Sequence, residues 1–159
     1  PSLVHTGSMK TVLIIVGIVC VLCCGGAIGL FFVTKGAVEG VMKEAKTFGD
    51  DSVTAITKTW DMNALKDRSD SDLLSQQPKE LENVIAFGKD KLGPMQSFTG
   101  DVNLQIEAKS NSSQGSYAKI PYRATITCEK GKATVDLELI KRNDWDGWKI
   151  LTINVMAVQ

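Results

Sequence analysis

A run of 23 residues without a single charge, from Thr11 to Val33, constrains the fold of this chain more than any other feature. An α-helix rises about 1.5 Å per residue, so about 20 apolar residues cross a hydrocarbon core about 30 Å thick. A helix buried in a soluble protein is rarely apolar on every face over such a length. The run therefore predicts one membrane-spanning helix, and we expect a membrane anchor over residues 9–35.

Residues 1–8 are interpreted as a cloning remnant, because Gly7-Ser8 directly precedes Met9, which suits a native start. The remnant holds the only histidine of the chain, His5. The chemistry of the remaining residues is therefore expected to proceed without an imidazole.

Two other interpretations of the apolar run stay open. A cleaved signal peptide needs a small-x-small site, which Gly26-Ala27-Ile28 matches poorly. A lipoprotein signal needs a small residue in the place of Leu22, before Cys23 or Cys24. The run contains three cysteines, Cys20, Cys23 and Cys24, which are candidates for palmitoylation, an interchain disulfide or metal binding. In the other interpretation, a cysteine in lipid serves as a small apolar residue.

Gly25 and Gly29 are four residues apart within the run, a spacing that lets two membrane helices approach closely. They are the candidate helix–helix contacts of a homo-oligomer. The orientation is weakly encoded, since Lys10 precedes the run and lysines also follow it. A Met-Lys start leading directly into an apolar run is typical of a bacterial signal anchor. We therefore expect the bacterial inner membrane, with the domain on the periplasmic or extracellular side.

The residues after Val33 carry 17 basic and 18 acidic side chains, because only Lys10 of the 18 basic residues precedes them. A net charge of about −1 argues against nucleic-acid binding, which requires a basic face. About 120 residues suit one hydrophobic core, and we expect a single soluble domain over residues 36–159.

Apolar residues follow a helical period through the first half of this domain. The pattern predicts one long kinked helix or two helices over residues 36–60, and a third helix from Pro78 until Gly93-Pro94 ends it. The polar stretch 61–75 is expected to form a short helix and a loop. Three aspartates in it, Asp67, Asp70 and Asp72, lack the glycine and distal glutamate of a calcium loop, so a solvated loop is the preferred interpretation.

From Ser97 onward the apolar period changes from 3.6 to 2. Four alternating segments, separated by turn-rich runs, predict strands over residues 102–109, 117–128, 135–140 and 148–158. Hairpin-like connections in succession indicate an antiparallel meander. Helices before strands predict an α+β fold, with the helices packed on one face of a curved four-stranded sheet.

Three segments carry a resemblance to a known family: Thr59-Trp60-Asp61 followed by Leu65, KLGPMQSFTG at residues 91–100, and LELIKR with DGWKI at residues 137–142 and 146–150. With these motifs, residues 36–159 resemble the nuclear-transport-factor-two-like superfamily, the cystatin-like cone fold. Among its members, the chain is similar to small membrane-anchored bacterial envelope proteins of unassigned activity. Enzymes of this superfamily place Asp, His or Tyr inside the cone, and no such motif can be carried over here.

The sequence offers no catalytic, cofactor-binding or metal-ligating set. Nucleophilic catalysis usually pairs Ser or Cys with a histidine base, and zinc sites cluster Cys and His. Cys128 alternates with strand residues and is expected to be buried, as are Trp60 and Trp148. Three other aromatic residues, Trp145, Tyr117 and Tyr122, are the candidate contacts to a partner or ligand.

These observations predict a non-catalytic, membrane-anchored module for binding or assembly, with the membrane and either a like copy or a membrane protein as partner. Two alternatives remain. A pilin-like filament subunit also places an apolar helix before an α+β head, although the apolar run lacks the glutamate that such subunits use. A small-molecule carrier or enzyme would use the cavity of the cone.

Overall fold

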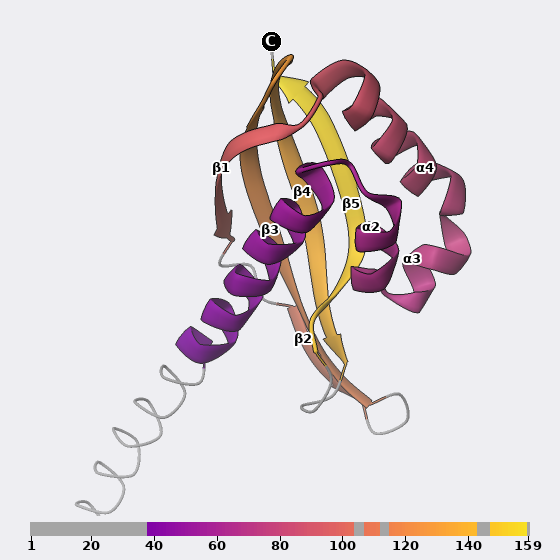
Figure 1. Ribbon diagram of the computed structural model, residues 1–159. Helices are drawn as coiled ribbons and strands as arrows, with labels where there is room; N and C mark the ends of the chain where they lie inside the picture. Colours follow the sequence, from indigo (N-terminus) through magenta and orange to yellow (C-terminus); the bar gives the residue numbers. More distant parts are fainter. Residues whose placement is uncertain (1–37, 104–106, 112–114, 143–146, 159) are drawn as a thin grey trace, which may run out of the picture. The chain divides into compact units, whose positions relative to one another are not determined.

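The computed structural model describes residues 38–103, 107–111, 115–142 and 147–158 (Figure 1). The expected anchor over residues 9–35, with Gly25 and Gly29, lies outside these residues, as does Trp145. None of the helices within the described ranges combines the length and the apolar character needed to cross a bilayer.

The helical half of the chain contains one long helix, drawn in indigo in Figure 1, and four shorter elements. The long helix covers residues 38–57 without interruption, so this segment forms one helix and not two. The shorter elements are α2 (Met62–Arg68), α3 (Ser71–Gln76), α4 (Pro78–Phe87) and a π-helical turn, η1 (Gly88–Leu92). Pro78 begins α4, where its missing N–H would have no partner, as predicted.

The stretch 61–75 forms two short helices, so the prediction of one helix and a loop is wrong. Aspartates supply both N-caps: the Asp61 carboxylate accepts from the backbone N–H of Asn63 at 2.8 Å, and that of Asp70 accepts from Asp72 at 3.0 Å. The polar residues that suggested a loop are thus the residues that begin the helices.

Five antiparallel strands follow: β1 (Met95–Val102), β2 (Glu107–Asn111), β3 (Gly115–Cys128), β4 (Gly131–Arg142) and β5 (Lys149–Val158). The sheet order is β1–β3–β4–β5, and β2 pairs with β3 next to β1, so the sheet is four strands wide. The α+β class and the antiparallel meander are confirmed.

The first predicted strand, residues 102–109, is wrong in its bounds. β1 starts at Met95 and pairs with Cys128–Tyr122, whereas β2 pairs separately with Lys119–Gly115. β1 is an edge strand, and Gln96 and Ser97 are both exposed, so no alternation marks its beginning. A strand predicted from alternating burial therefore begins later than β1 does.

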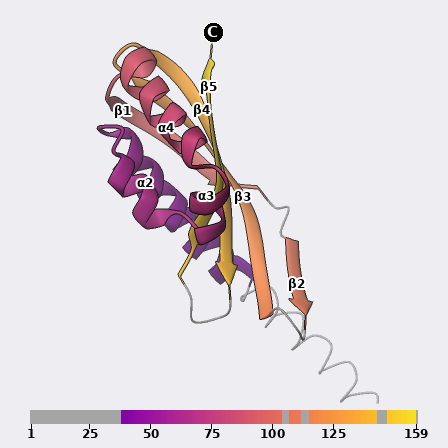
Figure 2. The same cartoon turned by 90° about the vertical axis from the view of Figure 1, so that its right-hand side faces the viewer.

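Alternate residues of β3 and β4 build the core. Ile120, Ala124, Ile126 and Val135 are nearly inaccessible and face the helices, which lie on one side of the sheet in Figure 2. Cys128, Trp60 and Trp148 are buried, as predicted.

Trp60 fixes the junction between the long helix and α2. Its backbone adopts a positive φ of 52°, and its indole N–H donates to the Gly93 carbonyl at 2.7 Å. The ring lies against Gly88, where a Cβ would come within 2.0 Å of a ring carbon. Only glycine at position 88 leaves room for this indole.

A bulge changes the expected alternation of β5. The pairing register shifts between Glu138 and Leu139, which leaves Leu151 as an extra residue on β5. Ile150 therefore faces the core together with Ile153, whereas a strand without a bulge would turn these two residues to opposite faces. Leu151 lies instead on the face of the sheet opposite the core, which we call the outer face, and lines a groove there.

Candidate functional site

A groove of about 390 Å³ lies on the outer face of the sheet, beside α3. We call it the α3 groove. Its lining comes from α3 and the residue after it, and from β3, β4 and β5: Asp72, Leu73, Gln76, Gln77, Tyr117, Lys119, Ile140, Arg142, Leu151 and Thr152. The volume falls in the lower part of the range of ligand pockets, about 300–1,000 Å³.

The segment before α3 attaches this helix to the edge of the sheet. Ser69 forms an isolated parallel bridge to Ile150, and the backbone N–H of Asp70 donates to the Ile150 carbonyl at 2.8 Å. The Ser69 hydroxyl donates to the Leu65 carbonyl at 2.7 Å. Leu73 of α3 is buried. These contacts place one wall of the groove at a fixed position against β5.

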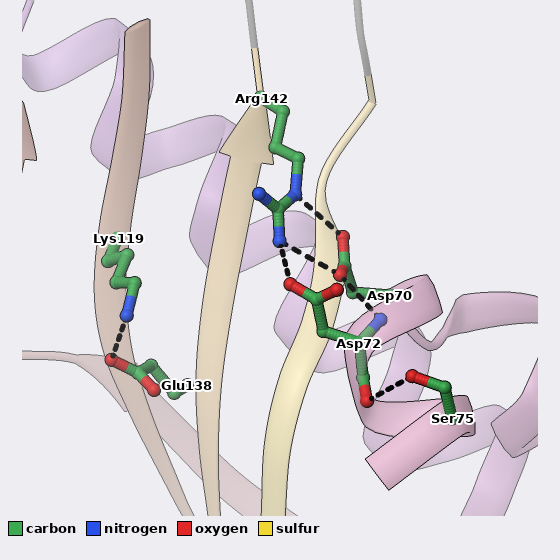
Figure 3. Close-up of polar contacts among 6 residues, drawn as sticks. All are labelled: Asp70, Asp72, Ser75, Lys119, Glu138 and Arg142. Atoms are coloured by element: carbon green, nitrogen blue, oxygen red, sulfur yellow. Dashed lines mark hydrogen bonds and ion pairs between the residues drawn. The ribbon is translucent and has the colours of Figure 1, made fainter. Parts of the chain in front are cut away.

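An ion-pair cluster of Asp70, Asp72 and Arg142 links α3 to the end of β4 (Figure 3). Arg142 donates from Nε and Nη2 to the two carboxylate oxygens of Asp70, each at 3.1 Å, and from Nη2 to Asp72 at 2.5 Å. The paired geometry with Asp70 is the bidentate arrangement that the planar guanidinium favours. The Asp70 side chain is only 8% exposed, so its charge depends on this partner.

The pKa of Asp70 reflects its place in the cluster. Burial by itself raises this pKa, but the hydrogen bonds from Arg142 and from the backbone N–H of Asp72, with the charges of Arg142 and Lys149, lower it further than burial raises it. The net shift is downward. The hydrogen bond to Asp70 likewise raises the pKa of Arg142. Asp70 and Arg142 are therefore both ionised near neutral pH.

The rest of the groove combines apolar and polar groups. Ile140 is 2% exposed and Leu151 half-buried, which provides an apolar floor. Lys119 Nζ lies 3.5 Å from Glu138 and 5.9 Å from the centre of the Tyr117 ring. An aromatic wall, an apolar floor and a rim of charged and amide groups can bind and orient a ligand.

The candidate contact residues fall in different places. Tyr117 is half-buried and lines the α3 groove. Tyr122 is 1% exposed on the core face, and its hydroxyl donates to Asp50 at 2.6 Å. Burial and the Asp50 carboxylate both raise the pKa of Tyr122 far above its ordinary value, so this hydroxyl stays protonated.

Sequence reasoning missed Arg142 and treated Asp70 and Asp72 as solvated loop residues. The sequence did contain one indication that Asp70 begins a helix: aspartate is a common N-cap residue, and Asp61 and Asp70 each cap a short helix. Nothing local to Arg142 indicates a partner 72 residues away. Among the described residues, no group of three or more His, Cys, Asp and Glu side chains is arranged to hold a metal ion.

Comparisons with known proteins assign neither a family nor a function to this chain. No family model and no curated protein matches the chain. A similar solved structure is an IcmL-like type IV secretion system protein from Legionella pneumophila, with 11% sequence identity over 74% of this chain and 93% of that one, and a TM-score of 0.31. The similarity is distant, and we draw nothing about function from it.

Proposed function

We propose that this chain is a non-catalytic binding or assembly module that an N-terminal helix holds at a membrane. In this proposal the α3 groove takes a short polypeptide segment of a membrane-protein partner. The observation that carries it is the groove itself, since Tyr117, Ile140 and Leu151 form an apolar recess on an otherwise polar sheet face. Tyrosine supplies a large contact area at a low entropic cost, which suits a binding surface.

The chemistry of the rim favours a peptide as the ligand. Gln76, Gln77 and Thr152 are exposed and carry side-chain donors and acceptors that match backbone N–H and C=O groups. Asp72 and Lys119 add one charge of each sign at the rim. A polypeptide segment offers both backbone groups and apolar side chains.

The interior of the domain favours a surface site over a cavity in the cone. The Trp60 and Tyr122 side chains, each 1% exposed, occupy part of the space between the sheet and the helices. Tyr122 packs so closely that a Cβ at Gly49 or Gly100 would come within 2.5 Å and 1.8 Å of it. The carrier or enzyme alternative requires that space for its ligand.

The membrane part of the proposal comes from the sequence. The uncharged run 11–33 and its Met-Lys start favour a signal anchor in the bacterial inner membrane, with the domain exported. The resemblance to nuclear-transport-factor-two-like envelope proteins agrees with such a placement. The near-zero net charge favours a protein partner over a nucleic acid.

The test is photo-crosslinking of the full-length protein in bacterial membranes, with a photoreactive amino acid in place of Gln76 at the rim. Irradiation is expected to yield one discrete adduct with a membrane protein. Tyr117→Ala in the same chain should lower the adduct about tenfold, the effect of losing about 1.4 kcal/mol of contact energy.

Thr125→Ala is the matched control, because Thr125 is exposed on the same face of β3 but outside the groove. It should leave the adduct unchanged. If Tyr117→Ala and Thr125→Ala give equal amounts of adduct, or no protein is captured, the α3 groove is not the binding site.

A further inference from the structure

Among the described residues, no strand pairs with the free edge of β5, and the backbone bonds there are confined to its first residues. Ser69 bridges to Ile150 and Asp70 donates to its carbonyl, but the sheet order ends with β5. Figure 2, which faces this edge, shows the end of β5 near the C-terminal mark with β4 beside it and no further strand. In an antiparallel sheet, every second residue of such a strand points its N–H and C=O groups away from the sheet.

Residues 152–158 lack the features with which proteins protect an edge. They contain no charged residue and no proline, and the bulge of β5 lies before them at Leu151. Met156 and Val158 are 46% and 49% exposed. The opposite edge strand, β1, differs, since it carries a register irregularity between Met95 and Ser97.

We propose that residues 152–158 of β5 pair antiparallel with the same segment of a second copy of this chain. The two sheets would then continue into one another through backbone hydrogen bonds. Of this segment only Thr152 also lines the α3 groove, and the pairing uses backbone groups, so it does not depend on what the groove binds.

The sequence of β5 is self-complementary about Asn154. With the two-fold axis at this residue, Thr152 lies opposite Met156 of the second copy, and Ile153 lies opposite Val155. Ile153 and Val155 face the core side of the sheet and are half-buried, so pairing covers apolar surface on that side. β-branched and apolar cross-strand pairs of this kind stabilise antiparallel sheets.

Charge favours a like copy as the occupant. The residue opposite Asn154 on β4 is a charged one, Asp136, which forms an ion pair with Arg123. In the dimer the two Asp136 residues would be three strand spacings apart, about 14 Å. This exceeds the screening length of about 8–10 Å at ordinary ionic strength, so self-pairing meets little repulsion.

The experiment uses the full-length protein in membranes, with a photoreactive amino acid in place of Met156, which is 46% exposed and outside the α3 groove. Irradiation is expected to give a homodimer, and mass spectrometry of the adduct should place the bond near Thr152 of the other copy. Asn154→Lys is expected to lower the dimer about tenfold, because the two-fold axis sets two ammonium groups against each other. The monomer should tolerate this lysine, since Asn154 is exposed and lies opposite Asp136.

Thr125→Lys is the control, with the same charge on the same face but two strands inside the edge. It should leave the dimer at its original level, and thermal unfolding should report intact folding for both variants. Crosslinks from position 156 to a different protein, or a homodimer that Asn154→Lys leaves intact, would overturn the proposal. Groove capture from Gln76 is scored in a separate experiment, so each proposal can fail without the other.

Discussion

Replacing Arg142 with alanine is expected to loosen α3 from the sheet and to destabilise the domain. The substitution removes two hydrogen bonds to Asp70 and one to Asp72. It leaves the Asp70 carboxylate, 8% exposed, with the backbone N–H of Asp72 as its remaining bond at 3.0 Å. A buried charge that loses its partner costs more than the pair itself contributed.

The magnitude follows from the exposure of each partner. The Arg142 and Asp72 side chains are 44% and 50% exposed, so water screens their ion pair and its contribution is below about 1 kcal/mol. The Asp70 bonds are better shielded, and a lost charged hydrogen bond costs about 1.5–3 kcal/mol before a discount for the exposure of Arg142. We expect the free energy of unfolding to fall by about 2 kcal/mol near neutral pH.

The loss of stability caused by Arg142→Ala is expected to depend on pH. The pKa of Asp70 is lower in the folded state than its ordinary value of 3.8, so the stabilisation is complete above that value and is lost as the pH falls toward the folded-state pKa. Without Arg142, burial dominates and the pKa of Asp70 rises. The difference in stability between the unsubstituted chain and Arg142→Ala should therefore be largest near neutral pH and shrink in acid.

Urea unfolding of the full-length protein in detergent, near neutral pH and near pH 3, measures both quantities. Arg123→Ala is the matched control, since Arg123 also bonds an aspartate, Asp136, on the outer face, but its side chain is 71% exposed. Only a small change is expected for the control. Equal destabilisation by the two substitutions, or a stability difference for Arg142→Ala that does not shrink in acid, would refute the reasoning.

Two further substitutions test the packing around the core aromatics, both by urea unfolding. Gly49→Ala should destabilise the domain by about 1–3 kcal/mol, because the new Cβ would lie 2.5 Å from the Tyr122 ring. Gly131→Ala is the control: its new Cβ has open space around it, and stability should change by less than about 0.5 kcal/mol. Trp60→Phe removes the indole N–H that donates to the Gly93 carbonyl at 2.7 Å, and it should lower the free energy of unfolding by about 1–3 kcal/mol. An unchanged free energy of unfolding would show that this carbonyl needs no partner.

The parts of the fold that the sequence predicted are those with one buried face. The long helix and α4 repeat their apolar residues at helical spacing, and β3 and β4 alternate, because each presents one side to the core. β1 lacks this alternation at its start, since it is an edge strand whose Gln96 and Ser97 are both exposed. The bulge at Leu151 was also missed, because a single extra residue in one strand has no signature in an apolar pattern.

The candidate site was predictable only in part. Tyr117 and Tyr122 are five residues apart on β3, and a strand turns alternate side chains to opposite faces, so the two tyrosines could never have shared one site. That conclusion was available from the sequence once β3 was recognised. The contact between Asp70 and Arg142 was not, because it depends on where α3 lies against β5, a tertiary feature that no local pattern encodes.

The position of α3 connects the two surfaces that the structure offers to partners. Through Ser69 and Asp70 the chain covers the edge of β5 at Ile150, and the same helix forms a wall of the α3 groove. In our proposal the edge of β5 after this point, residues 152–158, pairs with a second copy. None of these residues belongs to the ion-pair cluster of Asp70, Asp72 and Arg142. Loosening α3 through Arg142→Ala should thus weaken capture in the groove while the pairing of β5 persists, because backbone groups of residues 152–158 keep their place beside β4.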